Sequence, residues 1–280
     1  MTGPDRPGVR DTLEDRRRDD RRALVCYLPA GYPDLDTSVA CLHAADEAGA
    51  DLLEIGFPFS DPIMDGPTIQ AACQHALDRG YRVDDFLDVA RRVTAATPAP
   101  ALVMTYFTIA AVRGLAPFAR DCADAGLSGA ILPDLPAGES GSWLAAARDA
   151  GLETVFLAAS VSSEARLAAI SAASTGFVYA TGLLGVTGVD AVRRSARDLV
   201  SRIRQHTNLP VLVGVGVSTP QQARDVAGYA DGVIVGSALV RAAGDGDPAG
   251  APDRVAALVG ALRAGVDAAA PRPAPGATRA

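Results

Sequence analysis

The sequence predicts a single (β/α)8 barrel, the fold known as a TIM barrel, and three observations favour it. Short apolar segments alternate with amphipathic helical patterns along most of the chain, which indicates βα units and a parallel sheet. Hydrophobic residues make up 49% of the chain and aromatic residues only 5%, so the core is aliphatic. A length of 280 residues suits one barrel domain. A doubly wound sheet is the alternative fold for the same alternation.

Eight segments have the features of strands that are buried on both faces. Each is short, continuously apolar and bounded by Gly, Pro, Asp or Ser, as the strands of a parallel sheet are. We expect strands at Ala23–Leu28, Leu52–Ile55, Ala101–Thr105, Ala130–Leu132, Thr154–Leu157, Phe177–Tyr179, Val211–Val213 and Gly232–Val235.

Helical patterns separate these strands. Thr219, followed by Pro-Gln-Gln, predicts a capped helix start. Residues 1–20 are expected to form a disordered lead or a short first helix, residues 21–264 the catalytic barrel, and residues 265–280 a flexible tail rich in Ala and Pro. Among the expected helices are Thr37–Ala48, Thr68–Arg79, Val83–Ala95, Gly141–Ala150, Ala165–Ala173 and Asp198–His206.

The composition excludes several kinds of chemistry. All 26 basic residues are arginines, so a lysine Schiff base on this chain is excluded. The histidines lie far apart on helical patterns, which predicts no metal site: they are His43, His75 and His206. The four cysteines are widely spaced, which predicts reduced thiols. A net charge of −7 argues against general affinity for nucleic acid or anionic membrane. With no apolar leader or spanning run, we expect a cytoplasmic protein.

Carboxylates in one segment are the first candidates for catalysis. Glu54 interrupts an apolar strand, and a side chain pointing into a barrel there would have its pKa raised by desolvation, as an acid/base at neutral pH requires. A buried glutamate that only holds a loop is the alternative. Asp61 and Asp65 follow in a loop stiffened by prolines, and either is a candidate for a second carboxylate. The position of Asp65 before Gly66-Pro67 fits a helix N-cap equally well.

Glycine-rich turns near the C-terminus predict a phosphate site. In barrels, phosphate is commonly held by the loops after the seventh and eighth strands. Here these loops read GVGVS (214–218) and GSALV (236–240), and the loop at 185–188 (GVTG) follows the sixth strand. Glycines let backbone N–H groups approach an anion, and a helix that begins at Ser237 adds its dipole.

Together these motifs resemble the tryptophan synthase alpha chain family. The segment EIGFPFSDPIMDGPTIQ (54–70) carries most of the specificity, and MTY, PDLP, GFVYAT, GVTG, VGVGVST and DGVIVGSALV follow in the expected order. The match covers about residues 22–243. It implies a TIM barrel that cleaves indole-3-glycerol phosphate by a retro-aldol step to indole and glyceraldehyde 3-phosphate.

The resemblance also implies roles for single residues. Glu54 would shuttle protons between the C3′ hydroxyl and indole C3. Asp65 would bind the indole N–H and stabilise the positive indolenine. Substrate contacts are implied at Tyr106, Tyr179, Thr187, Gly188, Gly216, Gly236 and Ser237. The chain itself would carry no cofactor and no metal; pyridoxal phosphate would belong to a partner, the tryptophan synthase beta chain, in an αββα heterotetramer.

Three loops depart from the family pattern. They are Phe107-Thr108-Ile109 where Asn-Pro is usual, Leu183-Leu184 where a polar residue is common, and Ala159-Ser160-Val161-Ser162 where Pro-Thr or Pro-Ser is usual. The first lies where partners dock in the family, which leaves a stand-alone indole-3-glycerol phosphate lyase as an alternative. Two further alternatives are a non-catalytic activator of a beta chain and an isomerase or aldolase acting on another sugar phosphate.

Overall fold

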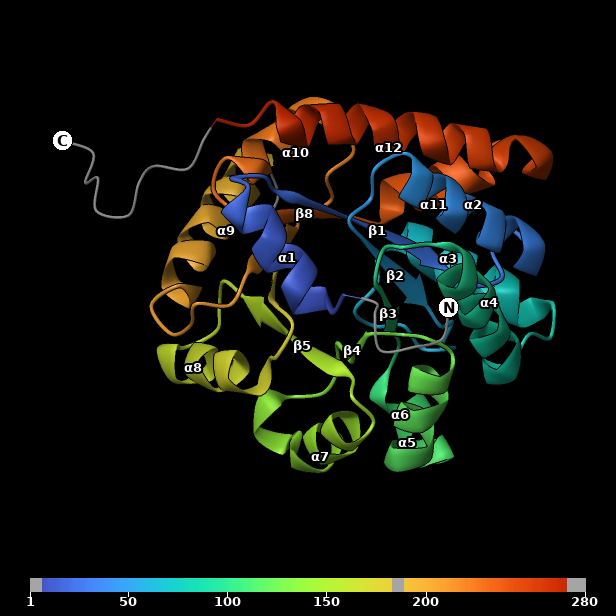
Figure 1. Ribbon diagram of the computed structural model, residues 1–280, viewed down its shortest axis with the longest axis horizontal. Coiled ribbons are helices and arrows are strands. Elements are labelled where there is room, and N and C mark those ends of the chain that lie inside the picture. Colours follow the sequence, from blue (N-terminus) through green and yellow to red (C-terminus); the bar gives the residue numbers. More distant parts are fainter. Residues whose placement is uncertain (1–6, 183–188, 271–280) are drawn as a thin grey trace.

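The chain forms a closed barrel of eight parallel strands (Figure 1). The computed structural model describes residues 7–182 and 189–270. The strands pair in sequence order and the last pairs with the first, so the barrel prediction is confirmed and the open doubly wound sheet is excluded. The strands are β1 (Ala23–Pro29), β2 (Leu52–Gly56), β3 (Ala101–Met104), β4 (Gly129–Ile131), β5 (Glu153–Ala159), β6 (Val178–Thr181), β7 (Val211–Gly214) and β8 (Gly232–Val235).

Helices surround the barrel as an outer ring (Figure 1). The cluster of buried residues between ring and barrel is mostly aliphatic, as the composition predicts. The α-helices are α1 (Val9–Arg18), α2 (Leu35–Glu47), α3 (Pro67–Asp78), α4 (Val83–Ala96), α5 (Phe107–Arg113), α6 (Leu115–Asp124), α7 (Gly141–Asp149), α8 (Glu164–Ala173), α9 (Val189–Ile203), α10 (Pro220–Ala227), α11 (Ser237–Gly244) and α12 (Ala251–Asp267), and the short 3-10 helices are Ala137–Glu139 and Pro248–Gly250.

Two helical regions differ from the sequence prediction. Helix α9 begins at Val189 and ends at Ile203, so the predicted helix Asp198–His206 is wrong at both ends. The backbone N–H of His206 bonds the carbonyl of Ile203, three residues back, so His206 lies in the turn that ends the helix. After β3 the chain forms two short helices, α5 and α6, divided by Gly114 at a φ of 87°. Glycine adopts this left-handed backbone without the strain that a side chain would cause.

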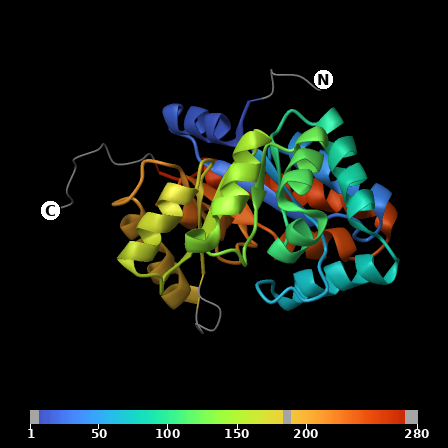
Figure 2. The same ribbon diagram turned by 90° about the horizontal axis from the view of Figure 1, so that it is seen from below.

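Side chains of alternating strand residues fill the barrel. The inner cluster contains residues of seven strands, such as Val25, Leu52 and Ile234, and Tyr179 of β6 packs against it. Val9 and Leu13 of α1 belong to the same cluster, so α1 closes the end of the barrel at which the strands begin. In Figure 2 this helix lies on one face of the molecule, and the connection between β2 and α3 lies on the opposite face.

Arginine–aspartate pairs attach α1 to the barrel. Asp51, before β2, is almost fully buried; it accepts the backbone N–H of Leu24 at 2.7 Å and pairs with Arg16 at 2.6 Å and Arg263 at 2.8 Å. These contacts join α1, the sheet and α12. Because buried charges require partners, this end of the barrel depends on the pairs being complete.

Helix α12 continues to Asp267, past the predicted start of the tail at residue 265. A β-carbon on Gly265 would lie 2.2 Å from the carbonyl oxygen of Pro220 in α10, so the two backbones touch there. This close packing against α10 holds the end of α12, where the sequence predicted the tail.

The four cysteines of the chain are buried and free. In the described ranges, no helix has the length and apolar content that crossing a membrane requires.

Candidate active site

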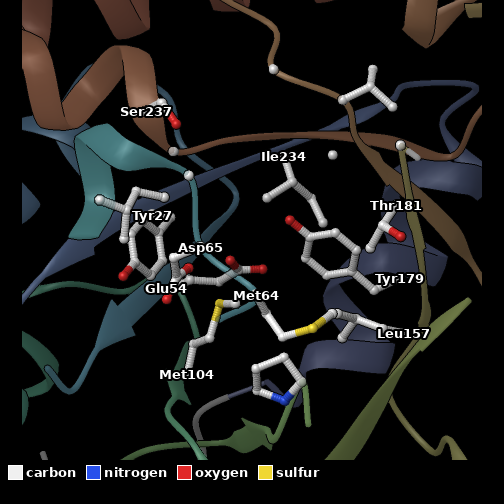
Figure 3. Close-up of a pocket in the computed structure, with 18 residues that line it drawn as sticks. Tyr27, Glu54, Met64, Asp65, Met104, Leu157, Tyr179, Thr181, Ile234 and Ser237 are labelled. Carbon is white, nitrogen blue, oxygen red and sulfur yellow. The ribbon is translucent and has the colours of Figure 1, made fainter. Parts of the chain in front are cut away.

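A cavity of about 370 Å³ opens at the carboxyl ends of the barrel strands. Its size falls in the range of small-molecule sites, roughly 300–1,000 Å³. Residues from all eight strands or the loops that follow them contribute to its wall, and Figure 3 shows Tyr27 and Tyr179 on either side of Glu54. The cavity lies at the end of the barrel where active sites of this fold are built.

Glu54 reaches this cavity from the centre of β2. Its strand neighbours are Tyr27 of β1 and Leu102 of β3. Glu54 is 1% exposed, and neither of its carboxylate oxygens has a hydrogen-bond partner within the described structure. Burial raises the pKa of Glu54 to about 8. At neutral pH the side chain is therefore mostly protonated and can donate a proton, which is the property expected of an acid/base.

Asp65 reaches the same cavity from the loop between β2 and α3. The N-cap of α3 is Gly66, so Asp65 does not cap that helix. Burial raises the pKa of the Asp65 carboxyl, while a hydrogen bond from the Tyr106 hydroxyl to Oδ2, at 3.0 Å, opposes the rise. Asp61, the other candidate, is exposed and accepts the hydroxyl of its neighbour Ser60. The structure thus brings Asp65, and not Asp61, together with Glu54.

The side of the cavity beside the carboxylates is apolar and suited to a flat ring. Tyr179 of β6 lines it, and burial, together with the charges of Glu54 and Asp65, raises the pKa of its phenol. Tyr179 therefore stays neutral. The other large lining side chains, which the sequence did not single out, are Tyr27, Met64, Ile69, Met104, Pro133, Leu157 and Ile234.

Most of these missed residues occupy inward positions of the barrel. Tyr27 pairs with Glu54 in register, Met104 pairs with Ile131, and Leu157 pairs with Tyr179. Side chains of paired residues in parallel strands point to the same face of the sheet. Every second residue of a strand points into the barrel. Once Glu54 and Tyr179 are taken as inward, this alternation could have identified the other inward residues from the sequence.

Glycines and one helix start form the opposite wall. Gly216, which follows β7, has a φ of 73°; Gly236 follows β8, and Ser237 is the first residue of α11. Gly236 is the N-cap of α11 without a side-chain cap, so backbone N–H groups at this helix start are available to an anion. Thr187 and Gly188, the two other predicted contacts, lie outside the described residues.

Tyr106, for which the resemblance implied a substrate contact, lies beside the loop that carries Asp65. It is 4% exposed and does not line the cavity; its hydroxyl instead contacts Asp65 and the backbone N–H of Met64. His43 and His75 lie on helices α2 and α3. Where the structure describes side chains, no group of three or more His, Cys, Asp or Glu residues is arranged to hold a metal ion.

Comparison with known proteins gives one family. The family model described as tryptophan synthase alpha chain matches residues 13–266. The tryptophan synthase alpha chain of Streptomyces avermitilis is 49% identical over 258 residues, which cover 91% of this chain and 93% of that protein. The tryptophan synthase alpha chain of Mycobacterium avium is 52% identical over 235 residues, which cover 84% and 86%.

Solved structures agree with the sequence matches. A structure of Mycobacterium tuberculosis tryptophan synthase in space group F222 superposes with a TM-score of 0.86 at 46% identity, covering 92% of this chain and 98% of that one. The tryptophan synthase subunit alpha of Legionella pneumophila superposes with a TM-score of 0.84 at 30% identity, covering 93% and 99%. The chain therefore belongs to the tryptophan synthase alpha chain family, whose members are lyases that cleave indole-3-glycerol phosphate in tryptophan biosynthesis.

Proposed function

We propose that this barrel cleaves indole-3-glycerol phosphate to indole and glyceraldehyde 3-phosphate with Glu54 as the proton shuttle and Asp65 as the stabilising anion. The observation that carries the proposal is that these two carboxylates, and no exposed neighbour such as Asp61, meet in one cavity with an apolar wall on one side and a glycine-lined helix start on the other.

The proton steps suit the environment of Glu54. Its protonated form, favoured by a pKa near 8, gives a proton to indole C3. The resulting Glu54 carboxylate then takes the proton of the C3′ hydroxyl while the C3–C3′ bond breaks. The electrons of that bond return to the indole ring, the C3′ carbon becomes the aldehyde, and Glu54 ends protonated as it began.

Asp65 stabilises the positive charge that forms between the two proton transfers. Protonation at C3 leaves positive charge on the indole nitrogen, and an ionised carboxylate accepting its N–H stabilises that charge where water is excluded. The hydrogen bond from Tyr106 favours the ionised form of Asp65 against the effect of burial. The proposed cycle uses Glu54 as an acid and Asp65 as a stabilising anion, two roles that require different protonation states.

The phosphate is proposed to bind at Gly216, Gly236 and Ser237, with Thr187 and Gly188 as further contacts in the loop after β6. A helix N-terminus attracts an anion through its unpaired N–H groups and its dipole. Ser237 lines the cavity at this helix start, and Figure 3 places it away from Met104 and Met64 on the apolar side. Tyr179 and the apolar layer would then enclose the indole ring.

Two substitutions test these roles. We expect Glu54→Gln to abolish indole release and Asp65→Asn to reduce kcat by at least about a hundredfold, because each removes an interaction of the transition state. Binding of indole-propanol phosphate, which cannot be cleaved, should persist in both variants. As a control, Asp61→Asn should keep normal turnover. Normal turnover by Glu54→Gln would mean that another group moves the proton.

A beta-chain partner belongs to the same proposal. Several matched structures from Mycobacterium tuberculosis are of tryptophan synthase. In the described part of this chain, the exposed large hydrophobic side chains all follow the carboxyl ends of strands: Ile63, Met64, Val112 and Val161. Burying such side chains against another protein is favourable. We propose a cytoplasmic αββα complex in which pyridoxal phosphate is held by the partner and this chain needs no cofactor.

Measuring lyase activity with and without a beta chain tests the partnership. We expect the rate of indole formation to rise when a tryptophan synthase beta chain is added, and the two chains to elute together on size exclusion. High activity alone that is unchanged by the beta chain, with no joint elution, would favour the stand-alone lyase instead. The outcome is open because Phe107-Thr108-Ile109 departs from the family pattern in the loop where partners dock in the family.

A further inference from the structure

The hydroxyl of Tyr106 makes two hydrogen bonds to one short loop. It donates to Oδ2 of Asp65 at 3.0 Å and accepts the backbone N–H of Met64 at 2.9 Å. The loop between β2 and α3 therefore has its backbone and its functional carboxylate attached to the same oxygen atom.

The ring of Tyr106 and the side chain of Thr105 contact the same loop nearer to its start. Tyr106 stacks on Phe59 with ring centroids 5.0 Å apart and an interplanar angle of 25°. The hydroxyl of Thr105 donates to the carbonyl of Phe57 at 3.1 Å. The two residues after β3 thus contact the loop at its beginning and at its end.

Tyr106 is itself held rigidly. It is 4% exposed and is the N-cap of α5. The next residue, Phe107, donates its backbone N–H to the carboxylate of Asp134 at 2.8 Å, which joins the start of α5 to the loop after β4. A tyrosine fixed in this way can hold another group, because its own backbone and ring have little freedom.

We propose that Tyr106 is a positioning residue for the reaction: its hydroxyl fixes the orientation of the Asp65 carboxylate and keeps Oδ1 directed to the indole N–H. The proposal rests on the proposed role of Asp65. It gives Tyr106 a role other than the substrate contact that the resemblance implied, and that side chain is not among the residues that line the cavity. A stabilising carboxylate must be held within a fraction of an ångström of its working position, and a supporting hydrogen bond does this.

The pKa shifts of Asp65 and Tyr106 also support this positioning role. The other titratable groups near it are Tyr27, Cys73, Glu54 and Tyr179. Burial raises the pKa of Asp65, and the Tyr106 hydrogen bond lowers it. Burial and the charge of Asp65 in turn raise the pKa of Tyr106, so the phenol keeps its proton and remains a donor.

Replacing Tyr106 by Phe tests the proposal, because it removes one oxygen and keeps the ring that stacks on Phe59. We expect kcat for indole release to fall about tenfold, as loss of a hydrogen bond to a charged group predicts, while KM changes less than about twofold. The acid limb of the kcat–pH profile should move to higher pH, because Asp65 loses the bond that favours its ionised form. Affinity for indole-propanol phosphate should stay within about twofold of wild type.

Tyr229→Phe is the matched control, since Tyr229 follows α10 and its ring faces Arg197 of α9. It should leave kcat and its pH profile unchanged. A Tyr106→Phe enzyme with wild-type kcat would overturn the proposal, as would a fall in kcat without a shift of the acid limb. A general loss of analogue binding and thermal stability would show a merely structural role, which also overturns it. A wild-type protein that releases no indole would instead refute the proposed function itself.

Discussion

The hydroxyl of Tyr27 occupies the space that a side chain at Gly56 would need: a β-carbon on that glycine would lie 2.3 Å from the phenolic oxygen. The two residues belong to adjacent strands, and Tyr27 is the register partner of Glu54. Because β1 and β2 are both fully buried, neither backbone has room to move away. The missing side chain at position 56 is what allows Tyr27 to lie beside Glu54 and line the cavity.

Gly56→Ala should therefore disturb both stability and activity. We expect the free energy of unfolding to fall by about 1–3 kcal/mol, as for other overpacked cores, and kcat/KM to fall because the Tyr27 ring must shift within the cavity. Denaturant unfolding and steady-state kinetics measure the two effects. In the control Gly260→Ala, an exposed glycine of α12 with no atom within 4 Å of the new β-carbon, stability should rise by about 0.5–1 kcal/mol at unchanged activity. Wild-type behaviour of Gly56→Ala would show that Tyr27 adjusts freely.

Glu54 should lower the stability of the folded protein at alkaline pH. Its pKa is about 8 in the folded state against 4.5 ordinarily, so between these values the folded protein keeps a proton that the unfolded chain has lost. The stability that this group contributes is present below pH 4.5 and lost as the pH rises through 8. The slope is at most about 1.4 kcal/mol per pH unit.

Glu54→Gln should remove that slope, because a neutral amide cannot ionise. Unfolding in urea at pH 6 and pH 9 measures this. The free energy of unfolding of the variant, relative to that of the wild type, should be higher at pH 9 than at pH 6. If the free energy of unfolding depended on pH equally in the two proteins, that result would contradict the raised pKa of Glu54. The expected result is an inactive enzyme that is more stable than the active one, as is common where a buried charge serves a reaction.

The pH dependence of activity should reflect the same group. Because the proposed cycle begins with protonated Glu54, kcat/KM should decline as the pH rises through about 8. A profile between pH 6 and pH 10 with indole-3-glycerol phosphate measures this. The phosphate of the substrate is fully ionised in the upper half of that range, so it does not account for a decline there. Constant kcat/KM up to pH 10 would mean that Glu54 starts the cycle ionised.

Asp51→Ala should loosen the end of the barrel that α1 closes. The change leaves Arg16 and Arg263 without their shared carboxylate and the N–H of Leu24 without its acceptor. We expect the free energy of unfolding to fall by about 3 kcal/mol, as when a buried ion pair loses one partner. The kcat of the folded fraction should not change, because the cavity is at the other end.

The control for this change is Asp149→Ala. Asp149 is exposed and pairs only with its exposed neighbour Arg148 among the ion pairs of the described residues, so its loss should cost less than about 0.5 kcal/mol. Equal destabilisation by the two substitutions would show that the buried network contributes no more than a surface pair.

Much of the fold could be predicted from local sequence. Strands that are buried on both faces must be apolar throughout, so segments such as Val211–Val213 and Gly232–Val235 identify themselves without knowledge of their neighbours. Glu54 could be predicted for the same reason, because a carboxylate in such a segment contradicts its surroundings. The sequence did not single out helices α5 and α6. Gly114 interrupts this region, and α5 has only 7 residues, about two helical turns.

The sequence by itself determined the barrel, its aliphatic core, the absence of lysine chemistry and the position of Glu54. Only the tertiary structure showed that Asp65, the carboxylate that the family resemblance favoured, lines the cavity while Asp61 does not. It also showed that Tyr106 donates to Asp65 and that Tyr27 lies over Gly56. The physical reason is the range of the interactions. Burial along one strand is a property of consecutive residues, whereas a hydrogen bond between residues 41 apart depends on strand register and on the path of a loop.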